Sequence, residues 1–170
     1  MLCWCNRVIG DLSHCCFKFV AEFATEQGGL SANVIKKAFN ATEEEFLHLV
    51  KRSLPVQPQI ASVGSCCLVG AISNDVLYVA NLGDSRAVLG RKVSEGQKSK
   101  VVAERLSKDH NVACEEVRKE VEALHPDDSA IVVPCRGVWR IKGIIQVLRA
   151  ACSALYVLFL VIDFVLLKIC

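Results

Sequence analysis

The chain has 170 residues, of which 52% are hydrophobic, and its 20 basic and 18 acidic side chains leave a formal net charge of +2. This length suits one domain, or one large piece of a domain, with a core of its own. The nearly neutral charge offers no basic face of the kind that nucleic-acid binding needs, so we expect no nucleic-acid partner.

The cysteine content is high, with ten cysteines that include the adjacent pairs Cys15–Cys16 and Cys66–Cys67. Adjacent cysteines suit neither the CxxC spacing of zinc sites nor an easy internal disulfide. The start, MLCWCNRVIGDLSHCC, lacks the basic-then-apolar order of a secretory signal. We therefore expect an intracellular protein whose reduced cysteines act as small apolar side chains. A metal site at His14 and Cys15, or lipidated N-terminal cysteines, are the alternatives.

The first part of the chain has helical patterns. Residues 17–29, FKFVAEFATEQGG, have the character of the last turns of a helix that ends at Gly28–Gly29. Ser31 is placed to cap a second helix, SANVIKKAF, and Thr42 is placed to open a third. Pro55 ends that third helix. These helices are expected to be scaffold.

The pattern becomes β-like from Ile60. The stretches IASVGSCCLVGAI and VLYVAN are apolar and β-prone, and residues 73–75 form a tight turn between them. The stretch AVLG, residues 87–90, continues after the polar turn LGDSR as a third strand. Three consecutive short strands joined by tight turns predict an antiparallel meander.

Residues 91–100, RKVSEGQKSK, are charged and predict a mobile loop. Asn111 is placed to cap a helix that runs to about Leu124. The stretches IVV and VWRIKGIIQV supply further strands.

The end of the chain, residues 150–167, is apolar at 16 of its 18 positions. That length is marginally sufficient to cross a bilayer. Asp163 lies near one end, where a charge costs less than at the bilayer centre. The segment is interpreted as a membrane anchor, as a buried helix, or as a tail with no partner to pack on.

Four stretches in order, SVGSCCLVGAI, LYVANLGDSRAVLG, LSKDHN and VWRIKGIIQV, resemble consecutive motifs of the metal-dependent protein serine/threonine phosphatases of type 2C. Two more, EQGGLSANVIKKAFNATEEEF and EEVRKEVEALHPDDS, resemble the plant branch of that family. The resemblance divides the chain into an unmatched segment 1–18, a partial phosphatase domain 19–147 and an apolar tail 148–170.

This resemblance implies an α+β fold, namely a partial β-sandwich with flanking helices that is incomplete at both ends. It also implies two Mg²⁺ or Mn²⁺ ions and a metal-activated water that attacks the phosphorus of phosphoserine or phosphothreonine. The implied partner is a phosphoprotein substrate or a regulatory protein.

The turn LGDSR is the candidate site. By itself, Asp84 predicts a turn acid that bonds its own backbone. The resemblance instead makes Asp84 a candidate metal ligand. Gly83 permits the sharp turn because it tolerates positive φ, and Arg86 is expected to pair with a carboxylate beneath the turn.

Activity requires several carboxylates that converge on two dications. The chain contains no Asp-Gly dipeptide, whereas the resemblance calls for one among the metal ligands. Asp84 alone matches a metal-site position, so we expect no catalytic residue, weak or no metal binding, and little or no phosphatase activity. The alternatives are a non-catalytic regulatory or interaction module, tethered to a membrane by residues 150–167, and an aberrant chain whose ends do not belong to a folded domain.

Other charged and aromatic residues are interpreted structurally. Asp109–His110 is expected to pack after a strand rather than to act as an acid–base dyad. Asp127–Asp128 is predicted to be a solvated turn, and Glu43–Glu45 to lie in the first turn of a helix. Trp139 is predicted to be a core aromatic.

Overall fold

The computed structural model describes residues 2–5, 10–62, 66–95, 98–144 and 163–168, and it has the expected α+β character. Its main sheet has four strands in the order β1-β2-β3-β8. These strands are β1 (Leu2–Cys5), β2 (Cys67–Ser73), β3 (Val76–Leu82) and β8 (Asp163–Lys168). Every neighbouring pair in this sheet is antiparallel.

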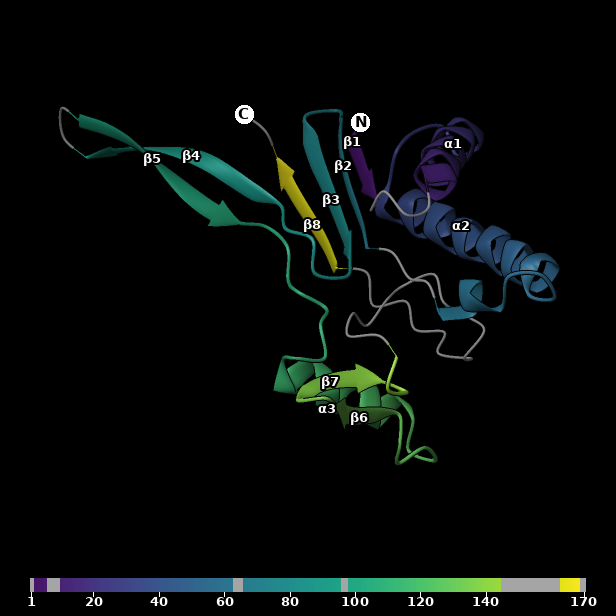
Figure 1. Cartoon of the computed structure of the whole chain (residues 1–170). Coiled ribbons are helices and arrows are strands. Elements are labelled where there is room, and N and C mark those ends of the chain that lie inside the picture. Colours follow the sequence, from purple (N-terminus) through teal and green to yellow (C-terminus); the bar gives the residue numbers. More distant parts are fainter. Residues whose placement is uncertain (1, 6–9, 63–65, 96–97, 145–162, 169–170) are drawn as a thin grey trace.

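Helices α1 (Gly10–Glu26) and α2 (Ala32–Ser53) pack on the main sheet (Figure 1). Their buried side chains meet those of β2 and β3 in one apolar cluster, which includes Val20, Ile35 and Val69. The 3-10 helix η2 (Pro58–Ser62) follows α2. Consequently, the predicted strand does not start at Ile60 but at Cys67.

Helix α2 is continuous, and the predicted new helix at Thr42 is wrong. The hydroxyl of Thr42 donates a hydrogen bond of 2.7 Å to the carbonyl of Ala38, one turn earlier, and so does not act as a cap. Phe46 and Val50 continue the buried side of the helix. Glu43–Glu45 therefore lie within α2 rather than in a first turn.

The hairpin between β2 and β3 is confirmed. Ser73 pairs with Val76, and the two residues between them, Asn74 and Asp75, have φ values of 51° and 59°. Asn and Asp tolerate this left-handed conformation better than most residues, which makes a two-residue hairpin turn accessible.

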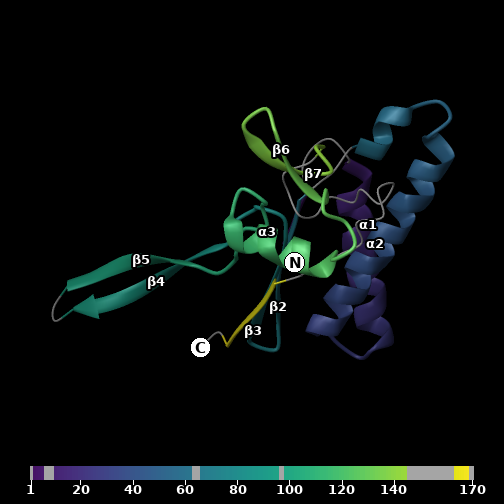
Figure 2. The same ribbon diagram turned by 90° about the horizontal axis from the view of Figure 1, so that it is seen from below.

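The third strand does not join this hairpin. Strand β4 (Val88–Glu95) pairs with β5 (Lys98–Arg105) in a separate two-stranded sheet, so the predicted meander is wrong. The second edge of β3 is already occupied by β8. Most of the predicted charged loop 91–100 therefore belongs to these two strands. Figures 1 and 2 show that the β4–β5 hairpin extends away from α1 and α2.

The apolar end of the chain contributes β8, whose Val165 lies opposite Val79 of β3. Asp163–Lys168 is thus a strand with a partner. The three interpretations of this segment had required either a helix or a tail without a partner. Residues 150–162 lie outside the described part of the chain. Within the described residues, no helix is both long enough and apolar enough to span a bilayer.

A third unit combines helix α3 (Glu115–Leu124) with the hairpin of β6 (Val132–Cys135) and β7 (Val138–Ile141), as the two predicted strands required. The helix starts later than predicted, because the side-chain oxygen of Asn111 accepts from the backbone N–H of Ala113 in a turn.

Trp139 is not a core aromatic: it is 38% exposed and lies against the guanidinium of Arg118.

The structure describes the side chains of six cysteines: Cys15, Cys16, Cys66, Cys67, Cys114 and Cys135. Two of them, Cys16 and Cys67, are buried in the apolar cluster of the main sheet, as expected of small apolar side chains.

The cap of α2 is testable. The hydroxyl of Ser31 accepts a hydrogen bond of 3.2 Å from the N–H of Val34. We predict that Ser31→Ala lowers the free energy of unfolding by about 1 kcal/mol in urea titrations. Ser94→Ala, on the exposed side of β4, is the control and should change it by less than about 0.5 kcal/mol. Equal effects of the two substitutions would contradict the capping role.

Candidate functional site

The candidate turn follows directly from β3, as the sequence indicated. Gly83 is buried and has φ 103°, a conformation that favours glycine. The carbonyl of Gly83 accepts a hydrogen bond of 2.9 Å from the N–H of His110. The turn is therefore attached to the loop that precedes α3.

The carboxylate of Asp84 is exposed and is held from two sides. One oxygen, Oδ1, accepts from the thiol of Cys66 at 3.2 Å, and the other, Oδ2, accepts from the amide of Asn111 at 3.0 Å. Both donors come from other segments of the chain, which gives the carboxylate a defined direction. Its partners are thus side chains far away in the sequence rather than the backbone of its own turn.

Arg86 pairs with a carboxylate, as predicted. Its Nε and Nη2 atoms donate to the two oxygens of Asp109 at 3.3 and 2.8 Å. Arg105 donates to the same carboxylate. The hydrogen bond from Arg86 is the largest cause of a lowered pKa of Asp109, and the same pair raises the pKa of Arg86. Asp109 thus links the turn after β3 to the end of β5.

Asn81 is a structural residue of the candidate site that the sequence reasoning missed. Its side chain has no exposed surface, and its Nδ2 atom donates to the carbonyls of Gly83 at 3.0 Å and Lys108 at 2.7 Å. It thus joins the turn to the loop before α3. The available signal was an amide within the apolar strand VLYVANL, because a buried polar group must find partners.

The described residues do not fit a two-ion metal centre. Among them, no three His, Cys, Asp or Glu side chains lie together in an arrangement that could hold an ion. Asp84 presents one carboxylate, and both of its oxygens already accept hydrogen bonds. Mg²⁺ and Mn²⁺ prefer several oxygen ligands, and the described residues do not bring such a set together at Asp84.

The remaining acidic pair lies in a turn, as predicted. Asp128 accepts from the N–H of Ala130 at 3.3 Å and forms an ion pair with Lys142. The hydrogen bond from Lys142 is the main cause of the lowered pKa of Asp128. These contacts connect the turn to the end of β7 and are structural.

The chain is similar in sequence to known proteins. A model of the family Protein phosphatase 2C matches residues 11–151. The chain is 72% identical over 135 residues to Probable protein phosphatase 2C 63 of Arabidopsis thaliana, which covers 79% of this chain and 36% of that protein. It is 71% identical over 134 residues to Probable protein phosphatase 2C 78 of rice, Oryza sativa subsp. japonica, with coverages of 79% and 34%. The chain thus spans about a third of the length of these relatives.

A solved structure of a sex-determining protein of C. elegans has a similar fold, with a TM-score of 0.63 and 16% sequence identity. The match covers 92% of this chain and 36% of that one. At this identity, the likeness supports the fold alone.

The buried amide gives a stability prediction. Asn81→Ala removes the donor of two backbone carbonyls, so we predict a loss of about 2–4 kcal/mol in the free energy of unfolding. The matched control is Asn33→Ala on the exposed side of α2, which should change it by less than about 0.5 kcal/mol. Similar unfolding midpoints for the two variants would contradict the role assigned to Asn81.

The lowered pKa of Asp109 gives a pH prediction. A carboxyl whose pKa is lower in the folded state contributes stability above its unfolded value of 3.8, and loses this contribution as the pH falls through the folded value. Asp109→Asn should therefore be less stable than the unaltered chain near pH 6, and the difference should shrink below about pH 4. Urea titrations across this range measure it, and a difference that is constant with pH would count against the ion pairs.

Proposed function

Because the chain belongs to the protein phosphatase 2C family, we propose that it is a phosphatase-like protein directed at phosphoserine and phosphothreonine proteins. The observation that carries the proposal is the Asp84 turn, in which a carboxylate expected to bind metal is held in a fixed direction by Cys66 and Asn111. A turn that served only to reverse the chain would not need to fix its carboxylate from two distant segments.

We propose further that this chain has little or no turnover. Two-ion hydrolysis requires several carboxylates, whereas the sequence contains no Asp-Gly dipeptide and the described residues offer Asp84 alone. A Mg²⁺ or Mn²⁺ ion at Asp84 would compete with the thiol and the amide for the same oxygens. We therefore expect one weak ion site.

The second candidate function is that of a non-catalytic regulatory or interaction module, which would bind a phosphoprotein or a regulatory protein without turnover. In support of this candidate, α3, β6 and β7 share an apolar cluster, and Asn111, in the loop before α3, donates a hydrogen bond to Asp84. A surface formed in this way could bind a partner without catalysis. A membrane tether is not part of this proposal.

The proposed lack of turnover is tested by measuring phosphate release from a phosphothreonine peptide by the purified chain in the presence of Mn²⁺. We expect phosphate release no faster than that of the Asp84→Ala variant. Turnover that disappears in Asp84→Ala would contradict the inactivity proposal.

Calorimetric titration with Mn²⁺ measures the number and affinity of metal sites without the need for catalysis. We expect at most one weak site, which Asp84→Asn removes. Asp75→Asn, an exposed change of equal charge in the β2–β3 turn, is the control and should leave the site unchanged. Two sites, or a site that survives Asp84→Asn, would be inconsistent with the assignment of Asp84.

A further inference from the structure

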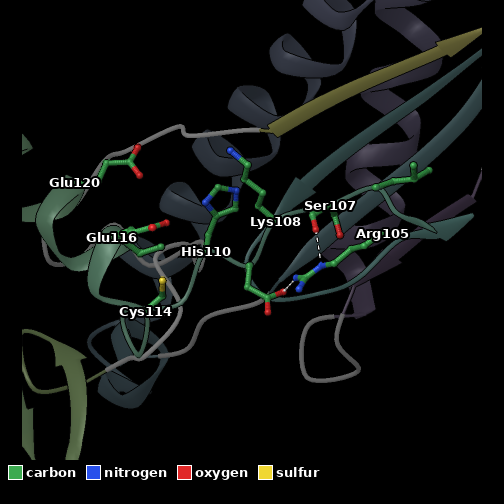
Figure 3. A pocket seen from close by; sticks show the side chains of 10 residues that line it. Arg105, Ser107, Lys108, His110, Cys114, Glu116 and Glu120 are labelled. Carbon is green, nitrogen blue, oxygen red and sulfur yellow. Dashed lines mark hydrogen bonds and ion pairs between the residues drawn. The ribbon is translucent and has the colours of Figure 1, made fainter. Parts of the chain in front are cut away.

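A groove of about 790 Å³ lies between the end of β5, the loop that follows it and the start of α3. Figure 3 shows side chains that line this groove. Residues 105–110, at the end of β5 and in the loop that follows, form one wall. The start of α3 forms the other wall, with the side chains of Cys114, Glu116, Val117 and Glu120.

The α3 wall is negatively charged. Glu116 and Glu120 are separated by one helical turn, so they lie on the same side of α3, and both are exposed. The neighbouring residue Val117 is buried and anchors α3 in the apolar cluster that it forms with β6 and β7. Like charges at this spacing destabilise a helix by a few tenths of a kcal/mol. A cationic group placed between the two carboxylates would remove that repulsion.

These two carboxylates have no partner among the described residues, whereas their neighbour Glu115 is paired with Lys119 at 2.7 Å. Glu122, which lies outside the groove, likewise has no cation among the described residues, so Glu116 and Glu120 are distinguished by their position on the groove wall. The whole chain carries a formal net charge of +2, so an attraction for basic groups must come from this local arrangement.

The opposite wall is held in place by the network of the candidate site. Asn81 binds the carbonyl of Lys108, and Arg105 donates to the carbonyl of Ser107 at 2.7 Å and to Asp109. The side chain of Lys108 is exposed along this wall. A groove with fixed walls loses little conformational entropy when a ligand binds.

The groove is also continuous with the candidate turn. His110 lines the groove and its N–H binds the carbonyl of Gly83, while the next residue, Asn111, binds Asp84. A peptide that brings a phosphorylated residue to Asp84 would therefore place its flanking residues beside α3.

We infer that this groove binds a basic segment of a partner protein, and that Glu116 and Glu120 select Lys or Arg side chains that flank the phosphorylated residue. The inference rests on the proposed function for the identity of the partner. The binding of a basic segment itself follows from the two unpaired carboxylates, and it applies equally to an enzyme and to a binding module. Nucleic acid does not fit this groove, because its phosphates would face the same carboxylates.

The test uses fluorescence anisotropy with the full 170-residue chain in the presence of a metal chelator. The probe is a labelled, unphosphorylated peptide in which arginines alternate with serines, and a peptide with glutamine in place of arginine is the negative control. We expect binding of the arginine peptide that weakens with added salt. Glu116→Gln combined with Glu120→Gln should weaken it by about threefold to tenfold.

The matched control combines Glu115→Gln with Glu122→Gln, which removes the same charge from α3 outside the groove. It should leave the affinity within about twofold of the unaltered chain. Equal losses in the two double variants would show an effect of overall charge and would overturn the inference. Equal binding of the arginine and glutamine peptides would also overturn it.

A second variant, in which the charges of Glu116 and Glu120 are reversed, tests whether these charges determine the preference for a basic peptide. Glu116→Lys combined with Glu120→Lys should bind the arginine peptide at least about tenfold more weakly and should bind an aspartate-containing peptide instead. Thermal unfolding followed by circular dichroism verifies that each variant is folded. Unchanged preference for the arginine peptide in the folded reversal variant would rule out the groove as its site.

Failure of this inference is distinguishable from failure of the proposed function. Asp84→Asn should leave binding of the unphosphorylated peptide unchanged, because the chelator removes metal and the probe carries no phosphate. Loss of that binding in Asp84→Asn would overturn the assignment of the site to Glu116 and Glu120. The Mn²⁺ experiments, in contrast, do not involve these two residues.

Discussion

The carboxylate of Asp109, held between Arg86 and Arg105, is the contact on which the rest of the site depends. Its three participants come from the turn after β3, the end of β5 and the loop before α3. An ion pair that is partly exposed contributes modestly to stability, so its main effect is to fix position. Because of it, the Asp84 turn and one wall of the groove belong to the same network.

Polar contacts matter here because the apolar clusters are separate. One cluster joins α1 and α2 to the main sheet, and another lies within α3, β6 and β7. The buried amide of Asn81 and the hydrogen bond from Asn111 to Asp84 connect the main sheet to the loop that leads into α3. The direction of the carboxylate and the position of one groove wall therefore both depend on contacts with this loop.

The candidate site was partly predictable. Gly83 and Arg86 belong to one short motif, and the chemistry of a glycine turn and of a guanidinium needs only local information, together with a carboxylate nearby. Cys66 and Asn111 could not be identified as partners of Asp84, because they are 18 and 27 residues away along the chain. The family was predictable because several motifs occur in order, and the match to residues 11–151 confirms it.

The sequence by itself determined the elements whose signals are local: the cap at Ser31, the hairpin between β2 and β3, and the β6 and β7 strands. Only the tertiary structure decided that α2 continues through Thr42, that β4 pairs with β5, and that Asp163–Lys168 pairs with β3. The physical reason is that an apolar strand has the same pattern whichever edge it joins. Which strand it pairs with depends on the sheet edges that are still unpaired when the rest of the chain has folded.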